Sequence, residues 1–168
     1  MHSKPRACYD GAMLRILPAV VLLLAVHADA APAHKTYAIS VDENAGGMHV
    51  FKVSATLPDT WSDVVDKQGS PEFHRAPAGM IGAIAGFAMP IDRALAGMFG
   101  DAKNPTKITK SAGRIWIVDK NASGAIHAAM FIPEDKGHVV MCETRLDAKY
   151  ADLLDEAAKT CDSVQLAK

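Results

Sequence analysis

Apolar and polar side chains alternate along residues 48–57, and this repeat of two residues predicts a half-buried β-strand. A shorter strand is predicted over residues 37–41, and a Gly-rich turn separates the two. Residues 62–67 are expected to form a short helical turn. Residues 68–79 contain several Gly and Pro breaks and are expected to form a loop.

An uncharged, Gly-rich run occupies residues 80–89 (MIGAIAGFAM), and we interpret it as a buried central strand. Gly82 and Gly86 in this run have the spacing that allows membrane helices to pack closely. Attachment to a membrane surface through residues 79–99 is therefore kept as an alternative. The run is too short to span a bilayer. Helical spacing of apolar residues predicts a helix over 91–99.

The last third of the chain predicts an antiparallel meander followed by a helix. Polar turns separate three predicted strands, at residues 114–119, 125–132 and 138–144. Apolar side chains then recur at helical spacing from Tyr150 to Cys161 and form one continuous stripe. The pattern as a whole predicts an α+β fold, in which an antiparallel sheet of about five or six strands is flanked by helices.

The N-terminus has the features of an export signal. Residues 16–26 form an uncharged apolar run that follows Arg15, and a small-x-small pattern ends at Ala30. We therefore expect residues 1–30 to be a cleaved signal peptide and residues 31–168 to be a single exported α+β domain, periplasmic or secreted. Cleavage after Ala33 instead of Ala30, and a start at Met13 instead of Met1, are alternatives that the sequence leaves open.

Two cysteines remain after the predicted leader, and they predict a disulfide. Cys142 lies in the last predicted strand and Cys161 lies on the apolar stripe of the terminal helix. An even number of cysteines in an exported chain is typical of disulfide bonding. Closing a loop of this length contributes roughly 3 kcal/mol to stability. The C-terminal helix is therefore expected to be tied to the sheet by a Cys142–Cys161 disulfide.

Composition and charge exclude several classes of function. Hydrophobic residues make up 49% of the chain and charged residues 22%, which is typical of a folded globular protein. The predicted leader contains three basic and two acidic residues, so 15 basic and 17 acidic residues remain, with a net charge of −2. A domain so close to neutrality has no general field for nucleic acid or for anionic membranes.

The sequence contains no motif that indicates catalysis, a metal or a cofactor. It has no GxSxG, SxxK or phosphate-binding loop. Five histidines follow the predicted leader, and none lies in a predicted helix, where a second His, Cys or carboxylate could complete a helical metal motif. We expect His49, at a strand start, and His138, beside a turn, to be solvated. His127 should lie on the opposite sheet face from Ile126 and Ala128.

One loop segment is the best candidate for contact with a partner. Phe73, His74 and Arg75 combine an aromatic ring with two polar side chains in the predicted loop, and we assign them as candidate partner-binding residues. Trp61 and Trp116 are expected to belong to the core.

The segment Leu57-Pro58-Asp59-Thr60-Trp61, which ends a strand, resembles the corresponding segment of the PsbP-like fold. That group includes a photosystem subunit and the DcrB-like small periplasmic proteins. The order of predicted elements over roughly residues 36–165 is also similar. The resemblance implies an antiparallel sheet flanked by helices and a role in binding or assembly, and it supplies no catalytic residue.

Together these features predict a non-catalytic binding or accessory protein of the periplasm. Its partner is expected to be an envelope protein or an incoming toxin, in an immunity-like or assembly-like role. A small periplasmic hydrolase or metal-dependent enzyme is the alternative. It requires several polar side chains to converge in one pocket, for example with His74 beside His49 or His127.

Overall fold

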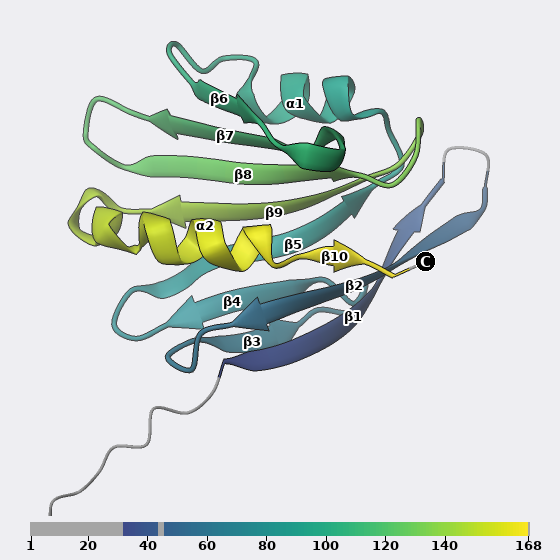
Figure 1. The fold of residues 1–168 in the computed structure, drawn as a ribbon, viewed down its shortest axis with the longest axis horizontal. Helices are drawn as coiled ribbons and strands as arrows, with labels where there is room; N and C mark the ends of the chain where they lie inside the picture. Colours follow the sequence, from purple (N-terminus) through teal and green to yellow (C-terminus); the bar gives the residue numbers. More distant parts are fainter. Residues whose placement is uncertain (1–31, 44–45, 168) are drawn as a thin grey trace, which may run out of the picture.

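The structure is a computed structural model that describes residues 32–43 and 46–167 (Figure 1). The predicted leader, residues 1–30, lies outside the described residues. The strands are Ala33–Asp42 (β1), Met48–Leu57 (β2), Ser62–Val65 (β3), Pro71–Arg75 (β4), Gly79–Phe87 (β5), Thr106–Thr109 (β6), Ile115–Lys120 (β7), Ile126–Pro133 (β8), Val139–Leu146 (β9) and Gln165–Leu166 (β10). The helices are Ile91–Phe99 (α1) and Leu154–Asp162 (α2), with short 3-10 helices at Ser111–Gly113 (η1) and Ala148–Leu153 (η2).

All strand pairs are antiparallel, which confirms the predicted α+β class. The strands form two sheets, one of three strands in the order β1-β2-β10 and one of seven in the order β3-β4-β5-β9-β8-β7-β6. The prediction of one sheet with five or six strands was therefore wrong. Three of the strands beyond the predicted number are short: β3, β4 and β6 have only four or five residues each.

The segments predicted as a helical turn and a loop are in fact β3 and β4. Pro71 is the first residue of β4, a position where a strand tolerates a missing N–H donor. Pairing with β5 then fixes β4 as a strand, with a register shift between Phe73 and His74. The Gly and Pro residues of 68–79 thus lie at the ends of a short strand and do not prevent that strand from forming.

The seven-stranded sheet is covered on both faces. On one face, the three-stranded sheet and α2 enclose the larger core, which includes Phe51, Phe73 and Met130 (Figure 1). On the other face, α1 packs through Ala94 and Phe99 against alternate residues of β8 and β9. Trp61 and Trp116 both belong to the larger core, as predicted.

A disulfide between Cys142 in β9 and Cys161 in α2 ties the C-terminal helix to the large sheet, as predicted. Both cysteines are buried. Arg114 adds a polar tie, because its guanidinium donates hydrogen bonds to the carbonyl oxygens of Asp162 and Val164. The end of the chain is therefore fixed to the sheet at several points.

Most of the uncharged run forms β5, which is an interior strand of the large sheet between β4 and β9, as predicted, although β9 is the middle strand. Its side chains Ile81 and Ile84 are buried in the larger core. Gly86 lies under the small sheet, where a side chain would meet Phe51. The Gly82 and Gly86 spacing thus serves close packing inside the domain. No helix within the described residues is long and apolar enough to cross a membrane.

Candidate functional site

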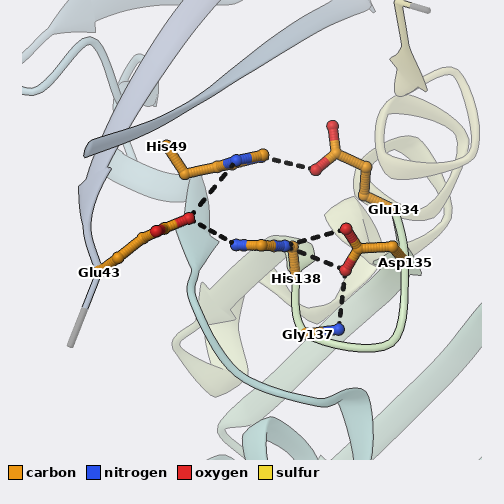
Figure 2. Close-up of polar contacts among 6 residues, drawn as sticks. All are labelled: Glu43, His49, Glu134, Asp135, Gly137 and His138. Carbon is orange, nitrogen blue, oxygen red and sulfur yellow. Dashed lines mark hydrogen bonds and ion pairs between the residues drawn. The ribbon is translucent and has the colours of Figure 1, made fainter. Parts of the chain in front are cut away.

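Two segments that are distant in the sequence meet at one end of the domain (Figure 2). The first is the β1–β2 hairpin, which contributes Glu43 just after β1 and His49 near the start of β2. The second is the turn between β8 and β9, which contributes Glu134, Asp135 and His138. We call these five residues the histidine–carboxylate cluster.

The strand phase of β2 places the first histidine. Phe51 is buried in the core, and His49 lies two residues before it on the same face of the strand. The two rings make an edge contact with centroids 4.5 Å apart. His49 therefore projects from the inner face of the hairpin toward the β8–β9 turn.

The second histidine is placed by the tight β8–β9 turn. The backbone N–H of Glu134 donates to the carbonyl of His138 at 3.1 Å and closes the turn. The imidazole of His138 then stacks on that of His49, with centroids 4.0 Å apart and planes 15° apart. Stacking of two imidazoles brings four ring nitrogens into one small region.

Each ring nitrogen of the two histidines faces a carboxylate (Figure 2). His49 Nε2 lies 2.6 Å from Glu134 Oε2, and its Nδ1 lies 3.9 Å from Glu43 Oε1. His138 Nδ1 lies 3.0 Å from Asp135 Oδ1, and its Nε2 lies 3.2 Å from Glu43 Oε1. Glu43 thus bridges the two rings on one side, while Glu134 and Asp135 hold them on the other.

These contacts shift the pKa values of two groups, His138 and Asp135. The hydrogen bond with Asp135 raises the pKa of His138 above its ordinary 6.5; partial desolvation opposes this and Glu43 adds to it. The backbone N–H of Gly137, which donates to Asp135 Oδ1 at 2.7 Å, is the largest cause of a lowered pKa for Asp135, and His138 lowers it further. The cluster therefore favours positive charge between its carboxylates.

Both histidines are less solvated than expected. Their side chains are 25% (His49) and 19% (His138) exposed, and the larger core closes one side of the pair. Local spacing could reveal only Glu134, Asp135 and His138, because His49 and Glu134 are 85 residues apart in sequence. A signal for His49 is phase, since it falls on the inner face that Phe51 defines.

The three residues predicted to bind a partner lie in β4. Phe73 is 1% exposed and packs against Trp61, so its ring is a core group. His74 lies 3.6 Å from Glu72, and Arg75 lies 3.7 Å from Glu156 of α2. The side chains of His74 and Arg75 are only partly exposed, at 34% and 28%, and the predicted loop cluster of three outward-facing side chains does not form.

A second polar group lies on the α1 face of the large sheet. His127 lies on the opposite face from Ile126 and Ala128, as predicted, and stacks on Phe99 with centroids 4.4 Å apart. Its Nε2 lies 3.3 Å from Glu143, which also contacts Arg145 at 3.3 Å. An open pocket of about 540 Å³ lies beside this group.

Hydrogen bonds and charge explain the state of Glu143. Burial raises its pKa, but the bond with His127 and the charge of Arg145 together outweigh burial and lower the pKa below 4.5. Glu143 is therefore ionised at neutral pH, with Arg145 as its ion-pair partner and His127 within hydrogen-bonding distance.

No family model matches this chain, and no curated protein matches it. Among solved structures, it is similar to a protein from Bacteroides thetaiotaomicron, with a TM-score of 0.49 and 13% sequence identity. The match covers 69% of this chain and 45% of that one, so this chain spans less than half of its length. The resemblance to PsbP-like proteins stays a prediction.

Proposed function

We propose that this protein is a non-catalytic binding protein of the cell envelope that engages a protein partner through the outer face of the β1–β2 hairpin. The predicted signal peptide and the Cys142–Cys161 disulfide support an oxidising compartment outside the cytoplasm. The cell envelope lies outside the cytoplasm and is oxidising, so it is such a compartment.

The observation that carries the proposal is a pair of exposed apolar side chains on this hairpin. Met48 is 66% exposed and Val50 is 45% exposed, and both lie on the outer face of β2. Met48 also borders an open hollow of about 660 Å³ between the hairpin and the β3–β4 turn. Adjacent exposed apolar groups beside a hollow are typical of sites that contact another protein.

The inner face of the same hairpin is held in place. Besides the histidine–carboxylate cluster, Tyr37 donates a hydrogen bond to Asp63 at 3.0 Å, and Ser40 N–H donates to the carbonyl of Gln68 at 2.7 Å. A surface fixed before binding loses less conformational entropy when a partner docks. The hairpin therefore presents Met48 and Val50 on a rigid support.

An enzyme is the second candidate, and the pocket beside α1 is the observation that favours it. His127 held by Glu143 has the arrangement of a base oriented by a carboxylate. The described residues that line this pocket include no serine, threonine or cysteine to act as a nucleophile. His74 lies beside Glu72 and not beside another histidine. We place binding first because the exposed side chains of Met48 and Val50 support it.

A pull-down from envelope extract tests the binding proposal with a matched control. The wild-type mature domain should recover a defined envelope protein. The double variant M48D/V50D should recover at least tenfold less of that protein. I108D places one aspartate on a 48% exposed side chain of the edge strand β6 and should retain recovery. Equal recovery by all three proteins, or a homodimer that depends on Met48 and Val50, would contradict the proposal.

A further inference from the structure

We propose that Glu43 Oε1, His49 Nδ1 and His138 Nε2 bind one divalent transition metal ion of the zinc type. These three atoms lie within 4.8 Å of one another. The inference goes beyond partner binding, because it assigns a small inorganic ligand to the opposite face of the hairpin. It stands whether or not Met48 and Val50 contact a protein.

The two distances from Glu43 to the histidine nitrogens fit a small ion. Zinc binds imidazole nitrogen and carboxylate oxygen at about 2.0–2.2 Å, so two ligands of a tetrahedral site lie roughly 3.4 Å apart. Glu43 Oε1 lies 3.2 Å from His138 Nε2 and 3.9 Å from His49 Nδ1. These two separations bracket the required value.

The remaining ring nitrogens provide an independent argument. Histidines that bind metals usually donate their other N–H to a carboxylate, which fixes the ring and makes it a better ligand. His49 Nε2 is held by Glu134 and His138 Nδ1 by Asp135, and these are the nitrogens that face away from Glu43. Asp135 is fixed in turn by the N–H of Gly137. Both histidines thus have the outer carboxylate that a metal ligand needs.

Binding one ion between stacked rings requires one ring to tilt. Parallel rings direct their lone pairs along parallel lines, whereas a shared ion must lie near the plane of each ring. His49 has 25% of its side chain exposed and touches Phe51 only by an edge contact, so its ring can turn without opening the core. A tilt that turns Nδ1 of His49 toward Glu43 would shorten their 3.9 Å separation.

The ligand set selects the class of ion. Two imidazoles with one carboxylate suit zinc, nickel or copper, whereas calcium and magnesium prefer oxygen ligands alone. The three carboxylates Glu43, Glu134 and Asp135 carry a formal charge of −3, which also favours a divalent cation. The chain offers three ligands here, which leaves a position for water or for a partner's side chain.

Titration calorimetry with ZnCl₂ on the untagged mature protein tests the site. One equivalent should bind, and H49A, H138A and E43Q should each weaken binding by at least tenfold, while D135N should weaken it by a smaller factor because it acts through His138. H127A is the matched control, since His127 is a carboxylate-paired histidine on the other face of the sheet, and it should bind as the wild type does.

Three results would overturn this assignment. The first is no zinc binding, and the second is undiminished binding by H49A and H138A. The third is loss of binding in D135N while E43Q binds zinc as tightly as the wild type does. The last would place the ion among Glu134, Asp135 and His138 instead. Thermal unfolding of every variant checks the fold. If a histidine variant unfolds, E43Q still tests the site, because it is a conservative change at a partly exposed side chain.

Discussion

Replacing Gly86 by alanine tests how the small sheet packs on the large one. A Cβ at this position overlaps two ring carbons of Phe51 and lies 3.0 Å from Val41 Cγ2. Carbon atoms in ordinary contact are about 3.5–4.0 Å apart. Phe51 is fully buried, so its ring cannot move away without separating the two sheets.

The cost follows from this overlap. Adding one methyl group to a packed core destabilises proteins by about 1–3 kcal/mol. We expect G86A to lower the free energy of unfolding by that amount. Gly97 is the matched control, because it is an exposed helical residue of α1 and its Cβ would meet nothing within 4 Å. G97A should stabilise the domain by about 0.5–1 kcal/mol, since alanine favours a helix over glycine.

Urea unfolding of the oxidised protein measures both variants, with fluorescence of the buried Trp61 and Trp116 as the signal. The free energies come from linear extrapolation at an unchanged m-value. Opposite signs for the two Gly-to-Ala changes are the expected outcome. A G86A protein as stable as the wild type would refute the packing of Phe51 over β5.

Two further predictions concern the disulfide and acid stability. The double variant C142A/C161A should lose about 3 kcal/mol in the same urea assay, because the bond closes a loop with a sequence separation of 19 residues; a loss below about 1 kcal/mol would contradict this. The lowered pKa of Glu143 means that its hydrogen bond with His127 and its ion pair with Arg145 stabilise the fold above its ordinary pKa of 4.5. This contribution disappears as the pH falls through the folded-state value. E143Q should therefore have a lower free energy of unfolding than the wild type at pH 7, and the difference between the two proteins should become smaller in acid. A difference that stays constant from pH 7 to pH 3 would be inconsistent with a lowered pKa of Glu143.

Periodicity in the sequence identified the elements that have long, regular patterns. The alternation in β2, the meander from β7 to β9 and the stripe of the terminal helix all depend on many residues that face one core. The edge strands β3 and β6 have mostly exposed side chains, so they carry no alternation to detect. Their pairing depends on neighbours distant in sequence, and the division into two sheets was missed for the same reason.

The candidate site was less accessible than the fold. Glu43 and His138 are 95 residues apart, and only the packing of the hairpin on the large sheet brings them within 3.2 Å. Phe73, in contrast, looked like a loop aromatic and is a core residue, because strand pairing overrides the local breaks around it. A sequence can show which residues have suitable chemistry, but tertiary packing decides which of them meet.

X-ray absorption spectroscopy of the zinc-loaded protein tests the metal site most directly. The account predicts nitrogen and oxygen ligands at about 2.0–2.2 Å, with scattering from two imidazole rings in the wild type and from one in H138A. Sulfur ligands near 2.3 Å, or a spectrum that is unchanged when both His49 and His138 are replaced, would contradict it.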